Sequence, residues 1–204
     1  MSEPVRVALQ VFEQADLLDV GGPYEVLLTA NRLAERDGRD APFDVELVAA
    51  SPGPVTLYGG MVVQVAADAG GHDVLVVPGA VDLAPVEADE TLLADVAMRA
   101  EVASLVTSVC TGSIVLAAAG VLGDGPATTH HEDLDVLRER RATGEVVSAR
   151  WVDAGDVVTG GGLSAGIAMA LHLVERLADR DLAVRTAAQI EYAWDPDDGL
   201  VATA

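Results

Sequence analysis

The sequence is short of several residue types, and each shortage excludes a class of site or protein. It has a single cysteine, Cys110, which excludes an internal disulfide and a cysteine-rich zinc site. Aromatic residues make up 3% of the chain, so nucleic-acid binding by base stacking has almost no side chains to use. The longest apolar runs, such as residues 114–122, are far shorter than the roughly 20 residues of a membrane-spanning helix.

Lysine is absent altogether, and acidic charge dominates. The 12 basic residues are all arginine and face 33 acidic residues, which gives a formal net charge of −21. Phosphate backbones and anionic membranes repel such a chain, so we expect neither nucleic acid nor membrane as a partner. Codon usage in a GC-rich genome explains the missing lysine but not the excess of acid. We therefore favour a halophile-like adaptation to a salty cytosol, where the Debye length falls to ~3 Å.

The chain length and the amino terminus predict a single cytoplasmic domain. The 204 residues are 50% hydrophobic, which is enough for a substantial core and fits one domain over 1–204. The first four residues contain no basic segment, and the apolar run 5–12 is too short and too early for a signal peptide.

Short apolar runs alternate with helical patterns along the chain. Residues 73–77 are a continuous apolar run that ends at Pro78-Gly79, typical of a parallel strand covered on both faces. Further strands are predicted at 5–12, 44–50, 104–109, 145–148 and 156–159, with a hairpin at 55–65. Helices are predicted at 90–100, 111–122, 132–141, 163–178 and 181–192, and from Gly21-Gly22-Pro23 through Ala34. This alternation predicts an α/β fold with a parallel sheet and helices on both faces.

Cys110 stands between a predicted strand and a predicted helix. It therefore lies at the carboxyl end of a parallel strand, where open α/β sheets place their ligands. It also lies at a helix N-terminus, where free N–H groups and the helix dipole stabilise a thiolate. This geometry matches the nucleophile elbow of serine hydrolases. The alternative is a buried structural cysteine, because free cysteine is among the most buried residue types.

Asp19 follows the first strand and is expected at the same edge of the sheet. Its neighbours Leu18 and Val20 and the adjoining Gly-Gly-Pro turn desolvate it locally, which favours a protonated carboxyl or a strong hydrogen bond. The alternative is an N-terminal cap for the following helix.

The histidines and the glycine-rich segment give no cofactor signal. His130 and His131 are adjacent and are expected to point in different directions, His72 lies in a glycine-rich loop, and His172 lies inside a helix. Without a second cysteine or a His-x-x-x-His pair, we predict no metal site. Residues 160–162 precede a helix but lack both a full dinucleotide fingerprint and a P-loop lysine.

Six segments together resemble the ThiJ/PfpI superfamily, and within it the isonitrile hydratases. They lie in the family order and span nearly the whole chain. The segments are Leu18-Asp19-x-x-Gly22-Pro23, Val76-Val77-Pro78-Gly79, Thr107-Ser108-Val109-Cys110-Thr111-Gly112-Ser113, Ala127-Thr128-Thr129-His130, Gly160-Gly161-Gly162-x-x-Ala165-Gly166-Ile167 and Gln189-Ile190-Glu191-Tyr192.

The resemblance implies a flavodoxin-like three-layer sandwich with a mostly parallel sheet, of the class I glutamine amidotransferase-like type. It also implies a homodimer without metal or organic cofactor. Cys110 is then the nucleophile, Asp19 the catalytic carboxylate, and Thr111 a residue whose hydroxyl or backbone N–H supports the site. Gly79 and Ala80 are expected to supply backbone N–H groups beside the sulfur.

Three positions depart from the family pattern, and they bear on the substrate more than on the nucleophile. Ala80 replaces a second glycine, which puts the local backbone in question because alanine disfavours positive φ. His131 replaces a tryptophan on the expected pocket wall, next to His130, and Ala168 replaces an acidic residue. We expect His130 and His131 to contact the substrate.

The implied activity is a hydro-lyase reaction, the hydration of an isonitrile to an N-substituted formamide through a thioimidate on Cys110. A glyoxalase-like, deglycase-like or peptidase-like activity stays open, because His130 lies 20 residues after the cysteine. A non-enzymatic redox sensor that cycles through sulfenic acid also stays open. A degenerate regulatory domain is the remaining alternative. AraC-type regulators add a helix-turn-helix domain, but here only 12 residues follow Tyr192, so we expect no such domain.

Overall fold

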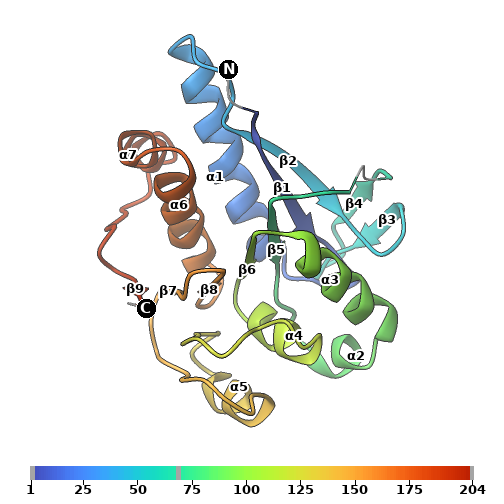
Figure 1. Cartoon of the computed structure of the whole chain (residues 1–204). Helices are drawn as coiled ribbons and strands as arrows, with labels where there is room; N and C mark the ends of the chain where they lie inside the picture. The colour runs from blue at the N-terminus through green and yellow to red at the C-terminus, as the bar shows by residue number, and fades with distance from the viewer. Residues whose placement is uncertain (1–2, 68–69, 203–204) are drawn as a thin grey trace.

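A computed structural model describes residues 3–67 and 70–202, and it contains a mostly parallel sheet between two layers of helices (Figure 1). The main sheet has the spatial order β2 (Phe43–Val48), β1 (Val5–Gln10), β5 (Val74–Val77), β6 (Leu105–Ser108), β8 (Val157–Gly160), β7 (Trp151–Asp153) and β9 (Leu200–Val201). One face carries α1 (Leu17–Arg36), α6 (Ala165–Leu177) and α7 (Arg180–Gln189), and the other carries α2 (Leu83–Glu87), α3 (Glu90–Val102) and α4 (Gly112–Ala118), with α5 (Leu134–Arg140) beside α4. This is the α/β fold that the alternation of strands and helices predicts, and the three-layer flavodoxin-like sandwich that the family resemblance implies.

The centre of the sheet is formed by the apolar runs. Strand β5 lies between β1 and β6, runs parallel to both, and has all four residues buried. The predicted hairpin is also present, as β3 (Gly53–Thr56) paired antiparallel with β4 (Val62–Val65). Its turn contains Gly59 and Gly60, both with positive φ, which explains the glycine pair. No helix among the described residues is long and apolar enough to cross a membrane.

Helix α1 begins at Leu17, earlier than the Gly-Gly-Pro sequence predicts. Asp16 caps it, because its carboxylate accepts a hydrogen bond from the Leu18 N–H at 2.9 Å. Pro23 therefore lies inside the helix rather than in its first turn. Gly22 faces α6 so closely that a Cβ atom would lie 3.1 Å from Ile167 Cγ1. Gly22 thus belongs to a helix–helix contact, and the Gly-Gly-Pro sequence does not mark a helix start.

The region between α5 and α6 departs most from the sequence prediction. Residues 145–148 do not form a strand; an isolated parallel bridge joins Ala127 and Val146. The antiparallel strand β7 follows instead and pairs with β8 around a turn that contains Gly155, at φ 92°. Both β7 and β9 are absent from the prediction, since runs of three and two residues are too short to show a strand period.

The fold brings four loops to one edge of the sheet. Strands β1, β5, β6 and β8 are mutually parallel neighbours, so their carboxyl ends meet there. The residues at or after the ends of these strands include Asp19, Gly79, Cys110 and 160–162. All of these belong to segments that the sequence singled out.

Candidate active site

Cys110 is held in a backbone conformation that favours glycine. Its φ is 56°, and its N–H donates to the carbonyl oxygens of Gly160, at 3.2 Å, and Gly161, at 2.9 Å. Its own carbonyl accepts from the Thr129 hydroxyl at 2.9 Å. A Cβ atom on the neighbouring Gly112 would lie 2.2 Å from a β5 carbonyl oxygen, so only glycine lets α4 start this close to the sheet. This is the strained strand-to-helix turn that the sequence predicts for a nucleophile.

Asp19 is fully buried in the first turn of α1. Its Oδ2 accepts from the Gly79 N–H at 2.9 Å, and its Oδ1 is buried without a hydrogen bond of normal geometry. A Cβ atom on Gly79 would lie 2.4 Å from Thr111 Oγ1 and 3.1 Å from Asp19 Oδ2, so glycine is required for this approach. Since Asp16 is the N-terminal cap of α1, the alternative prediction that Asp19 caps this helix is wrong.

Burial controls the protonation of Asp19. The pKa of the carboxyl is raised from 3.8 to about 7, mostly by burial and in smaller part by the nearby Asp16 carboxylate. The Gly79 N–H and the Cys110 thiol interact with the ionised form and lower the pKa in part. Burial therefore favours the protonated carboxyl of Asp19, as its apolar neighbours in the sequence indicate.

Burial also controls Cys110, against the expectation of a stabilised thiolate. Desolvation and then the Asp19 charge raise the pKa of the thiol to about 12. The backbone N–H groups of Thr111 and Leu163 bond to the sulfur and lower the pKa, but they do not outweigh burial. The resting form is thus a thiol beside a carboxyl group that can take its proton.

Thr111 joins the start of α4 to the loop after β5. The Ala80 N–H donates to Thr111 Oγ1 at 2.9 Å, and that hydroxyl lies 2.9 Å from the Ala80 carbonyl oxygen, to which it can donate in return. Ala80 is not among the residues with positive φ, so alanine fits this backbone. The N–H groups of Gly79 and Ala80, expected beside the sulfur, instead bond to Asp19 and Thr111. One of the N–H groups that do bond to the sulfur belongs to Leu163, a residue that the sequence did not identify as part of the site.

A cavity of about 260 Å³ opens at this edge of the sheet. It brings together Cys110, Thr111, Ala80 and His130, all predicted site residues. The rest of its lining is Asp16, Val81, Glu132, Asp133 and Leu163. Leu163 has a φ of 43° and lies directly after the triple glycine. A larger hollow of about 620 Å³, around 38–42 and 177–179, contains no nucleophile.

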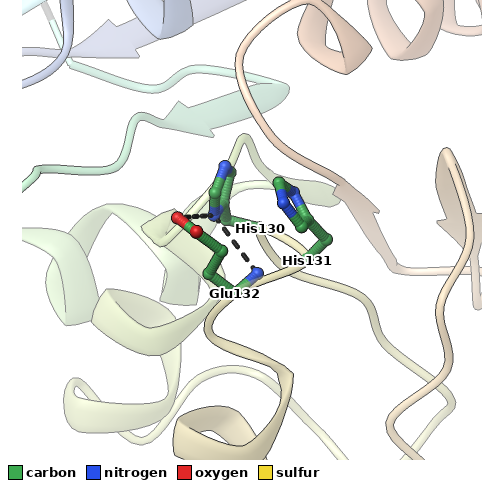
Figure 2. Close-up of side chains that lie close together, drawn as sticks. All are labelled: His130, His131 and Glu132. Carbon is green, nitrogen blue, oxygen red and sulfur yellow. Dashed lines mark hydrogen bonds and ion pairs between the residues drawn. The ribbon is translucent and has the colours of Figure 1, made fainter.

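The two histidines lie side by side rather than pointing apart, so that expectation is wrong (Figure 2). Their ring centroids are 4.3 Å apart. His131 lines a neighbouring cavity of about 300 Å³, which shares His130 and Leu163 with the first. A Cβ atom on Gly162 would lie 2.2 Å from the His130 ring, so the triple glycine makes room for this histidine.

Comparison with known proteins agrees with this fold. The profile of the DJ-1/PfpI family matches residues 5–176. An isonitrile hydratase from Pseudomonas putida is 37% identical over 195 residues, which cover 94% of this chain and 80% of that protein. A ThiJ/PfpI family protein from Pseudomonas syringae is 28% identical, with a TM-score of 0.81 over 96% of this chain and 78% of that one. Drosophila melanogaster DJ-1beta, 18% identical, has the same fold, with a TM-score of 0.78 over 94% of this chain and 100% of that one.

Proposed function

The chain belongs to the DJ-1/PfpI family, and we propose that it is a cofactor-free isonitrile hydratase in which Cys110 is the nucleophile. One observation carries the proposal. A strained cysteine on a cavity wall has a buried carboxyl group beside it, in a chain 37% identical to an isonitrile hydratase. The coarser conclusion, an enzyme of the hydratase or lyase type, follows from that relative.

The first step adds the thiol across the terminal carbon of the isonitrile. Ionised Asp19 takes the Cys110 thiol proton and delivers it to that carbon, which makes the carbon electrophilic. The S–H bond breaks, and one S–C and one C–H bond form, which gives a thioimidate on the sulfur. Splitting one difficult addition into two steps in this way is the general advantage of covalent catalysis.

The second step hydrolyses the thioimidate. Water attacks its carbon while Asp19 takes one water proton and passes it to the nitrogen. The C–S bond then breaks, the N-substituted formamide leaves, and the hydroxyl proton returns to the sulfur. The N–H groups of Thr111 and Leu163 stabilise the negative charge that develops on the departing sulfur.

The size of the cavity suits a small aromatic isonitrile. A cavity of ~150 Å³ holds a benzene molecule. The volume of about 260 Å³ beside Cys110 therefore accommodates an aryl ring with its isonitrile group.

The test is steady-state turnover of an aryl isonitrile, with formamide followed by chromatography at low and at molar salt. We expect Asp19→Asn to reduce turnover ~10²–10⁴-fold, the range for a positioned acid–base group. Asp89→Asn is the matched control, because Asp89 caps α3 and lies outside the cavity. Absence of formamide from folded wild-type protein, or full activity of Asp19→Asn, contradicts the proposal.

One observation favours a second candidate, glyoxalase-like chemistry. His130 lines the same cavity as Cys110, and a histidine beside the nucleophile suits proton transfer on a 2-oxoaldehyde. The same preparation is therefore assayed with methylglyoxal. Cysteine-dependent consumption of methylglyoxal without formamide production would replace the hydratase proposal with this one.

A further inference from the structure

Three metal-ligating side chains gather beside the cavity, and two of them, His130 and Glu132, line it. Among the residues that the structure describes, His130, His131 and Glu132 are the one group of three or more such residues, and their ligand atoms all lie within 4.8 Å of one another (Figure 2). His130 is half-buried, whereas His131 and Glu132 are exposed. The proposed hydratase mechanism uses neither His131 nor Glu132.

These atoms lie farther apart than the ligands of a formed metal centre, by a distance that side-chain rotation can close. His130 Nδ1 lies 3.9 Å from Glu132 Oε2 and 3.4 Å from Asp133 Oδ2. Tetrahedral zinc holds nitrogen and oxygen ligands at ~2.0–2.1 Å, which places the ligands about 3.3 Å from each other. Closing the group around an ion thus requires the exposed side chains to move by about 1.5 Å, through rotation about their own bonds.

The local charge and hydrogen bonding favour a cation. Nδ1 of His130 accepts one long hydrogen bond, from the Glu132 N–H at 3.4 Å, so its lone pair is readily available. The Glu132 and Asp133 carboxylates face this atom, and the chain carries a net charge of −21. Two imidazoles with a carboxylate suit zinc, nickel or copper better than magnesium or calcium.

Although the sequence alone predicts no metal site, we propose that His130, His131 and Glu132 bind one divalent transition-metal ion, zinc foremost, with a further coordination position open to water. His130 and Glu132 also line the cavity that contains Cys110. The bound ion therefore stands at the cavity rim and restricts access to the nucleophile. This inference goes beyond the proposed hydratase function and depends on neither turnover nor the cysteine.

The test is calorimetric titration of the untagged protein with zinc chloride. We expect one equivalent to bind, and His131→Ala and Glu132→Gln each to weaken binding at least about tenfold, since even a ligand's supporting partner is worth 10–100-fold. Glu139→Gln is the matched control, because Glu139 is an exposed acidic residue on the adjoining helix α5. We expect this variant to bind zinc with the affinity of wild type. Multiple weak equivalents that are unchanged in His131→Ala overturn the proposal.

A second readout excludes binding by the cysteine. Cobalt added in place of zinc gives a visible spectrum without a thiolate charge-transfer band, and Cys110→Ser binds with unchanged affinity. Loss of binding in Cys110→Ser alone assigns the metal to the sulfur and overturns the proposal. The zinc titration does not require isonitrile turnover. The metal-site proposal can therefore be tested even if the hydratase proposal is wrong.

Discussion

Asp19 is a single residue whose burial links stability to chemistry. Because the carboxyl group has a pKa of about 7 and the thiol beside it a pKa of about 12, the pair holds two protons below neutral pH and one proton at mildly alkaline pH. The two values belong to the pair, because each group's charge shifts the other. Two predictions follow from this one arrangement.

The first concerns the pH dependence of turnover. The thiol proton needs an ionised Asp19 to receive it, so kcat/KM should rise with pH through an apparent pKa near 7 and then stay level through mildly alkaline pH. The measurement is kcat/KM for an aryl isonitrile between about pH 5 and about pH 9. A flat profile across this range, or one that falls through pH 7, contradicts the assigned role.

The second concerns stability. The folded state raises the pKa of Asp19 above its unfolded value of 3.8, so protonation of Asp19 stabilises the fold below about pH 4, and this contribution is lost as pH rises to about 7. Asp19→Asn cannot ionise, so we expect it to unfold with a free energy roughly 1–3 kcal/mol above wild type at about pH 8. In urea titrations, the difference in free energy of unfolding between Asp19→Asn and wild type should shrink as the pH falls toward about 4. An equal difference at both pH values contradicts this account.

At the scale of elements, the site depends on how helix starts are tied to the sheet edge. The sequence placed the carboxyl-edge residues correctly, because apolar runs reveal buried strands and the residues after them. It misplaced the start of α1, because Gly-Gly-Pro resembles a helix boundary, whereas Asp16 provides the cap and Gly22 serves the contact with α6. It also missed Leu163, since no local pattern shows that a turn after β8 delivers an N–H to a sulfur on α4.

The junction of α4 with the loop after β5 gives an element-scale prediction. Thr111→Val removes the hydroxyl that bonds both the N–H and the carbonyl of Ala80 and leaves them buried and unpaired. We expect a loss of about 1–3 kcal/mol in the free energy of unfolding. Thr111→Ser keeps the hydroxyl and is the matched control. Equal stability of the valine and serine variants in urea unfolding contradicts this role for the hydroxyl.

At the scale of the whole molecule, the charge of −21 is the dominant feature. Its self-repulsion opposes the compact state, and salt screens it as the Debye length falls from ~10 Å at 0.1 M to ~3 Å at 1 M. We predict that the melting temperature rises between these two concentrations of potassium chloride. Sodium chloride, which screens equally, should reproduce the rise at equal ionic strength. No change with either salt contradicts the interpretation of the acidic surface as an adaptation to salt.

The catalytic claim about the molecule is tested most directly by one comparison. Turnover of an aryl isonitrile is measured for wild type and for Cys110→Ala, with circular dichroism to establish that both are folded. The account predicts formamide at a steady rate from wild type and no more than the protein-free rate from Cys110→Ala. Formamide production by the alanine variant at the wild-type rate would contradict it.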